Sequence, residues 1–311
     1  MTRHLTRLQV PGFQVVDYLG KGARSTIWRV RERRGNRLCA LKRVFKQPGD
    51  DDRFLDQALN EFRIARNFDH PAVRKYYRLR RLRRRFKVHE LQLLMELCEG
   101  DNCQLRRPTD VQEIIRIFLV VAQAVTHIHS RGYLHGDIKP NNIIVAAEGT
   151  VKIIDFGQSC PIGTIKPRIQ GTPDFIAPEQ VYCRPLDART DVFNFGAALY
   201  WTLTGRPIPT VLPKEGNGVQ LRDDLRVTPP EEHNPEVPPA LARLVLDCIE
   251  LHPSRRPHSM RAAGARLELI AHSLERNARA AEQAPTQEPP QGPQPPPPGD
   301  SPPEAPEGTP E

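Results

Sequence analysis

The chain has 311 residues, a formal net charge of +8 and 38% hydrophobic residues. This length is enough for one large domain or two smaller ones with a sizeable core. No window approaches eighteen unbroken apolar residues, and the first fourteen residues lack the apolar stretch of a secretory signal, so we expect neither a membrane span nor a leader. The six cysteines form no C-x-x-C pair, which favours reduced thiols in a cytoplasmic protein over a zinc site or a disulfide framework.

The two ends of the chain differ from its middle. Residues 277–311 are rich in Pro, Glu, Gln and Gly, and no Lys or Arg occurs from Ala281 onward. Such a segment buries too little apolar surface to offset its ordering entropy, so we expect a disordered, acidic, Pro-rich tail. We expect residues 1–12 to be an N-terminal extension and residues 13–276 to form the folded domain, which is then more basic than the whole chain.

The first predicted hairpin carries two glycines separated by one residue, between β-prone flanks. Its residues of interest are Leu19, Gly20, Gly22, Ser25 and Ile27. Glycines at this spacing let backbone N–H groups approach a phosphate, although a plain turn would show the same pattern. The next predicted strand contains Ala40 and Lys42, and on its own this lysine could equally be a surface residue.

A helix is predicted from Phe54 to Ala65, because apolar residues recur there at helical spacing. The three aspartates at positions 50–52 precede it and can cap it. Glu61 lies between core positions of this helix rather than on its polar face.

Residues 74–87 form an unusually basic run that includes Arg78, Arg80, Arg81, Arg83, Arg84 and Arg85. One interpretation is a solvated hairpin whose charges prevent edge-to-edge strand pairing. The alternatives are a docking surface for an acidic partner, for nucleic acid or for the chain's own acidic tail.

The rest of the chain is predicted to be mainly helical. A strand carrying Met95, Glu96 and Cys98 runs into a Gly turn, and a buried scaffold helix follows over residues 110–128. Residues 206–239 are Pro-rich and predict a long loop with one short helix. Residues 241–251 and 260–274 predict the closing helices.

Residues 133–145 place an acid, a base and an amide close together, namely Asp137, Lys139 and Asn142. An Asp can accept a hydroxyl proton, a Lys can neutralise charge on a moving phosphate and an Asn can hold a metal, which is the set that phosphoryl transfer needs. Thirteen residues after Asn142, a second β-like run ends in Asp155-Phe156-Gly157.

Taken in order, these motifs resemble eukaryotic-type serine/threonine protein kinases over roughly Phe13 to Leu274, and a bacterial member of that family is one option. Gly136 stands where most members carry the Arg of H-R-D, and Ser25 where they carry a third Gly. The resemblance implies an α+β, bilobed fold. Residues 13–97 would form a small antiparallel β-sheet lobe with one helix, and residues 98–276 a larger, mainly helical lobe.

The resemblance also implies where ATP and Mg²⁺ would bind. Leu19, Gly20, Gly22, Ser25, Ile27 and Ala40 would surround the nucleotide, with Met95 as gatekeeper and backbone groups of Glu96 and Cys98 bonding the adenine. Lys42 would hold the α- and β-phosphates and pair with Glu61. Asn142 and Asp155 would bind magnesium. The segment after Cys98 is short, so the helix that usually follows there is expected to be trimmed or missing.

Further roles follow from the same resemblance. Asp137 and Lys139 would be catalytic, with Thr172 hydrogen-bonded to both, as is typical of Ser/Thr kinases. The expected structural residues are Glu179, paired with Arg256, and Asp191, whose carboxylate would cap the catalytic-loop backbone.

The expected partners are proteins that offer Ser or Thr hydroxyls. Because the Arg of H-R-D is absent, we expect activity that depends little on phosphorylation of residues 158–170. The alternatives are a small-molecule kinase of the aminoglycoside or choline kinase type, which shares H-G-D, and a non-catalytic pseudokinase scaffold. Nucleic acid and membranes are not expected as partners, and the sequence does not indicate an oligomeric state.

Overall fold

The computed structural model describes residues 9–22, 24–47, 52–209 and 227–283. Two compact units make up the chain, Met1–Ser273 and Leu274–Glu311. Several predictions fall in whole or in part outside the described residues. They concern the extension at residues 1–8, the aspartates at positions 50 and 51, the loop at residues 210–226 and the tail at residues 284–311.

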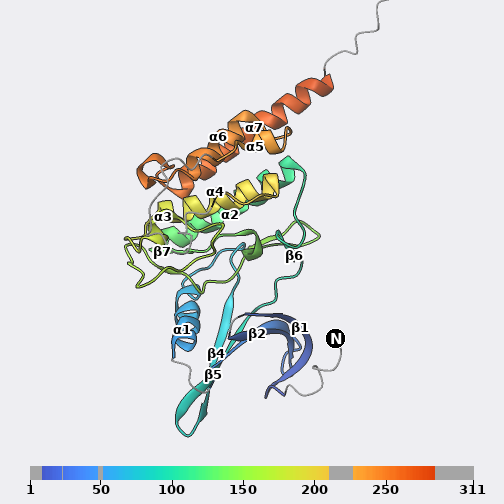
Figure 1. Cartoon of the computed structure of the whole chain (residues 1–311). Coiled ribbons are helices and arrows are strands. Elements are labelled where there is room, and N and C mark those ends of the chain that lie inside the picture. Colours follow the sequence, from blue (N-terminus) through green and yellow to red (C-terminus); the bar gives the residue numbers. More distant parts are fainter. Residues whose placement is uncertain (1–8, 23, 48–51, 210–226, 284–311) are drawn as a thin grey trace, which may run out of the picture. The chain divides into compact units, whose positions relative to one another are not determined.

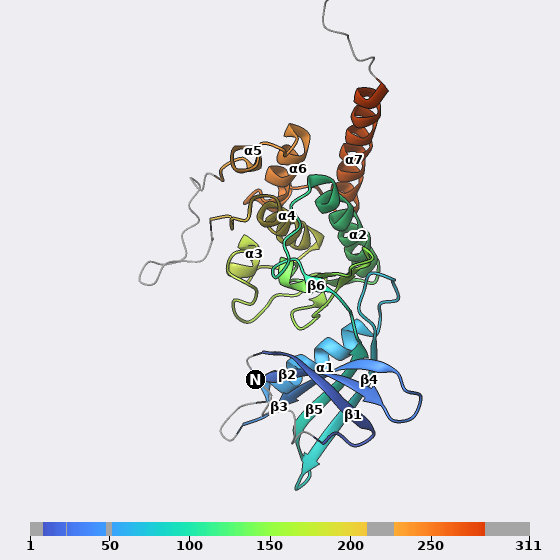
Figure 2. The same cartoon turned by 90° about the vertical axis from the view of Figure 1, so that its right-hand side faces the viewer.

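The first part of the chain forms an antiparallel sheet of five strands (Figures 1 and 2). The strands lie side by side in the order β1-β2-β3-β5-β4. Their bounds are β1 Phe13–Lys21, β2 Ser25–Glu32, β3 Leu38–Phe45, β4 Tyr76–Arg84 and β5 Lys87–Glu96. The basic run therefore lies on β4 and on the turn to β5, as the sequence predicted for a hairpin.

One helix, α1 (Arg53–Ala65), packs against strands β3, β4 and β5. Its buried face includes Leu55, Ala58 and Phe62, and Glu61 lies among them. Asp52 occupies the N-cap, but its side chain does not cap the helix as the sequence predicted. Its carboxylate instead lies 2.7 Å from Lys46 Nζ and pairs with this lysine rather than with the backbone N–H groups of the helix.

The second part of the described chain is mainly helical, with short strands near the site. Its elements are β6 Asp101–Asn102, α2 Val111–Ser130, β7 Tyr133–Leu134, η2 Pro140–Asn142, β8 Ile143–Val145, β9 Val151–Ile153, β10 Cys160–Pro161, α3 Pro178–Val181, α4 Ala188–Thr204, α5 Pro230–His233, α6 Pro239–Cys248, η3 Pro253–Arg255 and α7 Met260–Gln283. No helix occurs between residues 98 and 110, all of which are described, in agreement with the short segment there. The sheet part and the helical part together confirm the α+β fold that the sequence predicted.

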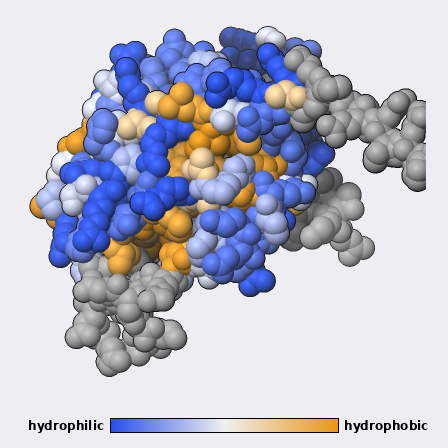
Figure 3. All heavy atoms as spheres, turned by 90° about the horizontal axis from the view of Figure 1, so that it is seen from above, coloured by the Kyte–Doolittle hydropathy of each residue, from blue (hydrophilic) through white to orange (hydrophobic). Residues whose placement is uncertain are grey.

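Two helices form the core of the helical part. Asp110 caps α2 by accepting hydrogen bonds from the backbone N–H groups of Gln112 and Glu113. Helix α2 packs against α4. The ring centroids of Phe118 and Phe195 lie 5.3 Å apart in an edge-to-face contact. Seen from above, the helical part shows polar side chains around a central apolar area (Figure 3).

Helix α2 is, within the described ranges, the one helix long and apolar enough to cross a membrane by length and composition. The sequence expectation of no span considered only unbroken apolar runs, which α2 does not contain. The apolar stretch of α2 is 56% buried inside the fold. Burial against the rest of the domain accounts for its composition.

Helix α7 extends further than the sequence predicted. The tail was expected to begin at residue 277, but residues 277–283 are helical. They contain Ala, Arg, Glu and Gln, which favour a helix, and the first proline of the tail comes only at position 285. The prediction of disorder was therefore wrong for these seven residues.

Candidate active site

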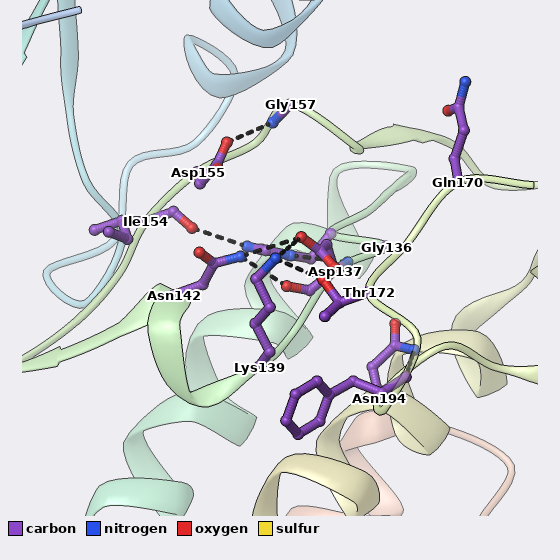
Figure 4. Close-up of polar contacts among 12 residues, drawn as sticks. Gly136, Asp137, Lys139, Asn142, Ile154, Asp155, Gly157, Gln170, Thr172 and Asn194 are labelled. Carbon is purple, nitrogen blue, oxygen red and sulfur yellow. Dashed lines mark hydrogen bonds and ion pairs between the residues drawn. The ribbon is translucent and has the colours of Figure 1, made fainter. Parts of the chain in front are cut away.

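Three side chains meet at the loop between β7 and β8 (Figure 4). Lys139 Nζ lies 2.6 Å from Asp137 Oδ2 and donates a 2.6 Å hydrogen bond to Thr172 Oγ1. The Thr172 hydroxyl donates to Asp137 Oδ1 at 2.9 Å. Thr172 comes from a segment 35 residues further along the chain, so the fold brings together residues that the sequence keeps apart.

The side chain of Asn142 bridges two positions of the same loop. Its side-chain N–H donates a 2.8 Å hydrogen bond to the backbone carbonyl oxygen of Asp137. This leaves Oδ1 of Asn142 as an oxygen ligand for a cation. Figure 4 shows Lys139, Asn142 and Thr172 all turned toward Asp137. The loop thus fixes one carboxylate between a cationic, a hydroxyl and an amide group.

A buried carboxylate on α4 supports this loop from below. Asp191 accepts hydrogen bonds from the backbone N–H groups of His135 and Gly136, at 2.9 and 2.8 Å, and lies 2.8 Å from His129 Nε2. Burial alone would raise the pKa of Asp191, but the hydrogen bond from His129 and the neighbouring histidines outweigh it and lower the pKa. Asp191 is therefore an ionised anchor beneath the loop, in the place the sequence predicted.

Gly136 has a backbone conformation that disfavours a larger residue at its position. Its φ is +74°, and a Cβ built there would lie 3.1 Å from the backbone oxygen of Gln158. A side chain at position 136 would thus meet both backbone strain and crowding.

Two side chains that the sequence analysis missed connect the segment between Gln158 and Gln180. Lys166 Nζ donates to the carbonyl oxygen of Gln158 at 2.6 Å and to Gln170 Oε1 at 3.1 Å. Gln180 Nε2 donates to the carbonyl oxygen of Gly136 at 2.9 Å. Neither residue carried a sequence signal, because both act through contacts that exist only once the segment folds back on the catalytic loop.

A second charged cluster lies between the sheet and the helical part. Lys42 Nζ of β3 pairs with Glu61 Oε2 of α1 at 2.8 Å and lies 3.7 Å from Asp155 Oδ1. Tyr76 donates a 2.6 Å hydrogen bond to the other oxygen of Glu61. The predicted pair of Lys42 and Glu61 is therefore present, and Tyr76 is a partner that the sequence analysis missed.

The charges of this cluster stabilise one another. Burial opposes the charged form of Lys42, but Glu61 and Asp155 outweigh it and raise the lysine's pKa. In turn, Lys42 lowers the pKa of Asp155, although burial opposes the shift. Both groups are therefore charged at neutral pH and can orient a ligand that carries phosphates and a cation.

A cavity of about 200 Å³ opens beside this cluster. Its lining includes Ser25, Lys42, Glu61 and Asp155, so the glycine hairpin, β3, α1 and the residues after β9 all contribute. Gly22 approaches Ser25 so closely that a Cβ at position 22 would lie 2.7 Å from the serine Oγ. A small residue at position 22 keeps this hairpin tight over the cavity.

The remaining predicted nucleotide contacts lie on neighbouring strands of the sheet. Gly20 pairs with Ile27 across the β1–β2 hairpin, and Leu19 precedes it. Ala40 pairs with Met95 between β3 and β5, and both are buried. These five positions thus belong to the four adjacent strands β1, β2, β3 and β5.

The segment that leaves β5 connects the sheet to the helical part. The Glu96 N–H donates to the Lys75 carbonyl oxygen, and the Glu96 carbonyl oxygen lies 4.0 Å from the Cys98 thiol, which donates to it weakly. Arg74, which is buried, donates from Nε to Cys98 Sγ at 3.3 Å. This contact of Cys98 was not predicted from the sequence.

The oxygen atoms available at the site suit magnesium. Asp155 offers a carboxylate that is 46% exposed, and Asn142 offers the amide oxygen left free by its bond to Asp137. Magnesium prefers such oxygen ligands and keeps several waters of its own. The described residues contain no cluster of three or more His, Cys, Asp or Glu that would form an all-protein metal cage. A carboxylate and an amide oxygen are the types of ligand that a magnesium ion also held by phosphates would need from the protein.

A buried ion pair ties the segment after Thr172 to the helical part. Arg256 donates to both carboxylate oxygens of Glu179, at 2.8 and 3.0 Å, and Thr190 donates to the same carboxylate. Arg256 also donates to the backbone oxygen of Arg189. The predicted pair is therefore present and is fully hydrogen-bonded, as a buried pair must be.

The fold and the two charged clusters are those of the protein kinase class. The family model described as "Protein kinase domain" matches residues 13–266. The chain belongs to this family.

The curated relatives are named as serine/threonine-protein kinases. The chain is 27% identical to serine/threonine-protein kinase PknD of Chlamydia caviae over 82% of its length, and 27% identical to PknD of Chlamydia pneumoniae over 80%. It is 26% identical to PknD of Chlamydia felis over 80%. The chain spans only 31%, 30% and 30% of these relatives, respectively, so the similarity concerns one domain of longer proteins.

Proposed function

We propose that this protein is an ATP-dependent serine/threonine protein kinase, with residues 13–276 as its kinase domain. The observation that carries the proposal is the contact of Thr172 with both Asp137 and Lys139, because it joins the segment before Glu179 to the catalytic loop. The names of the curated relatives, which are serine/threonine-protein kinases, support the same activity.

In this proposal Asp137 aligns the substrate hydroxyl and accepts its proton. Lys139, 2.6 Å from Asp137, stabilises the negative charge of the phosphoryl group as it moves. Lys42, held by Glu61, binds the α- and β-phosphates of ATP. The carbonyl of Glu96 and the N–H of Cys98 hold the adenine, in a pocket closed by Leu19, Ile27, Ala40 and Met95.

Magnesium is the proposed cofactor, with Asn142 and Asp155 as its protein ligands. When bound, it would neutralise charge on the β- and γ-phosphates. Asp155 is prepared for this role because Lys42 keeps its carboxylate ionised.

We also propose that activity does not require phosphorylation of residues 158–170. The usual Arg of H-R-D orders this segment through a phosphate, and Gly136 provides no such group. Lys166 and Gln180 support the proposal, because they connect the two ends of the segment to each other and to Gly136 with neutral acceptors.

The segment from Gly171 to Glu179 favours a protein substrate over a small molecule. It is anchored at one end by the bonds of Thr172 and at the other by the pair of Glu179 with Arg256. Small-molecule kinases of the H-G-D type lack this segment. A pseudokinase is disfavoured because Lys42, Asp137 and Asp155 are all present. A cytoplasmic location rests on the cysteine pattern alone and stays a proposal.

The test is incubation of the full chain with ATP and Mg²⁺, first alone and then with a protein extract, followed by mass spectrometry. We expect new phosphoserine and phosphothreonine on proteins and none without magnesium. Phosphate on small alcohols or aminoglycosides alone would overturn the proposal, and so would a lack of any transfer by a protein that binds ATP.

A further inference from the structure

The hairpin of β4 and β5 projects beyond the other strands of the sheet (Figures 1 and 2). Arg84 pairs with Lys87, so the turn at its tip consists of Arg85 and Phe86 alone. The residue Phe86 is 98% exposed, the most of any large hydrophobic residue in the described parts of the chain. An aromatic ring thus stands in solvent at the end of an extended arm.

The turn keeps these two residues in an unfavourable backbone conformation. Arg85 and Phe86 have φ values of +47° and +70°. A two-residue hairpin turn with positive φ at both positions strongly prefers Asn-Gly or Asp-Gly. A bulky residue in this region is a backbone outlier, and such outliers cluster at functional sites.

Cationic side chains surround the exposed ring. Arg83, Arg84, Arg85 and Lys87 are all exposed, and none of them pairs with a carboxylate among the described residues. In contrast, Arg43 in the middle of the same sheet forms a two-bond pair with Glu90. The charge at the tip is therefore available to an external polyanion.

The geometry points to an anionic lipid surface as that polyanion, and we propose that the tip of this hairpin docks there. The cations would contact lipid phosphates while Phe86 enters the headgroup region, where aromatic side chains are favoured. This differs from the sequence expectation of no membrane partner, which considered only segments that could span a bilayer.

The size and position of the patch favour a lipid surface over other polyanions. A stable protein interface buries about 800 Å² on each partner, which is more than one projecting two-residue turn and its neighbours offer. Single-stranded nucleic acid needs successive aromatic platforms along a cationic groove. Here Phe86 has no aromatic neighbour at the tip, because Tyr77 lies at the other end of β4, with the Arg37 guanidinium stacked on its ring and Cζ 4.1 Å from the ring centroid. A bilayer requires only that the tip reaches it.

The test uses the full chain and sedimentation with vesicles of phosphatidylcholine alone or mixed equally with phosphatidylglycerol. We expect binding only to the anionic vesicles, with affinity falling as salt is raised. Each removed charge should weaken binding about five-fold, so Arg83→Ser/Arg84→Ser should lose about 25-fold. Phe86→Ser should lose about ten-fold.

Two variants separate the proposal from effects of bulk charge and of folding. Arg33→Ser/Arg34→Ser removes the same charge from the exposed turn between β2 and β3 and should bind as the natural protein does. Arg85→Asn/Phe86→Gly gives the turn its preferred residues, so it should raise the Tm and yet lose vesicle binding.

Three results would overturn the proposal. The first is an equal loss of vesicle binding in Arg83→Ser/Arg84→Ser and Arg33→Ser/Arg34→Ser. The second is vesicle binding by Arg85→Asn/Phe86→Gly at the level of the natural protein. The third is binding to single-stranded RNA or to an acidic peptide that depends on Phe86 and is tighter than binding to the vesicles. None of these results bears on kinase activity, because the hairpin tip lies outside the proposed catalytic residues.

Discussion

The side-chain amide of Gln180 donates a 2.9 Å hydrogen bond to the backbone carbonyl of Gly136, the residue that precedes Asp137. The other end of the same amide accepts from Ala177 N and from Asn194 Nδ2, both at 3.0 Å. One buried side chain therefore connects the catalytic loop, the start of α3 and helix α4. This connection holds the catalytic loop without any phosphate.

Gln180→Met should lower kcat about ten-fold or more while leaving the KM for ATP nearly unchanged. The methionine has a similar volume but leaves the carbonyl of Gly136 and the N–H of Ala177 unpaired, at a cost of about 1–3 kcal/mol each in stability. Steady-state kinetics with a peptide substrate measures the effect.

The matched control is Gln92→Met, since Gln92 is about as buried as Gln180 but its side chain, among the described residues, donates only to Glu90 on β5. The Gln92→Met variant should be less stable than the natural protein but should keep its kcat. If both variants lowered kcat alike, the effect of Gln180 would be one of general stability.

Thr164→Ala should leave the rate within about two-fold, as expected for a surface substitution. Residues 158–170 contain two hydroxyl groups, of Ser159 and Thr164. Ser159 is 1% exposed and donates to the carbonyl of His135, so it is not accessible to a kinase. Activity of the natural protein before and after phosphatase treatment provides the second measurement, and a large drop in either experiment would show that a loop phosphate is required.

The stability of the protein should fall in acid in a way that depends on Asp191. Its pKa in the folded state lies below the ordinary value of 3.8, with His129 and His135 as the causes that outweigh burial. The stabilisation is therefore complete above about pH 4 and is lost as the pH falls through the folded-state pKa. Urea unfolding between about pH 3 and 7 should show a shallower decline for Asp191→Asn, which should also be about 3 kcal/mol less stable at neutral pH. Parallel pH curves for the two proteins would contradict this role.

Arg256→Met should destabilise the fold by about 3–5 kcal/mol, because it leaves the Glu179 carboxylate buried without its partner. The double variant Glu179→Gln/Arg256→Met should lose less than the two single variants summed. Arg243→Met provides the control, since Arg243 is 77% exposed and its pair with Asp247 should contribute less than about 1 kcal/mol. Thermal or urea unfolding measures all four proteins.

Local sequence pattern was enough to predict the elements and the residues that carry charge. Alternation and helical spacing predicted the sheet, α1 and α2, and the spacing within residues 133–145 predicted that Asp137, Lys139 and Asn142 meet. The order of the motifs also led to the family to which the chain belongs.

What the sequence could not predict depends on tertiary contacts. Lys166, Gln180 and Tyr76 are single polar residues without a local pattern, and each gains its partner only when distant segments meet. Asp52 was predicted as a helix cap by its position, but a nearby lysine competes for its carboxylate. The extension of α7 was missed because the proline content of the whole tail masked seven helix-forming residues.

The measurement that tests the central proposal most directly is transfer of labelled γ-phosphate to a protein substrate by the natural chain and by Asp137→Asn. Asparagine keeps the size of the side chain and can still accept the bond from Thr172, but it cannot accept a proton. We expect the variant to bind ATP normally while transfer falls by at least about 100-fold. Transfer at the natural rate by Asp137→Asn would contradict the assignment of Asp137 as the residue that activates the hydroxyl.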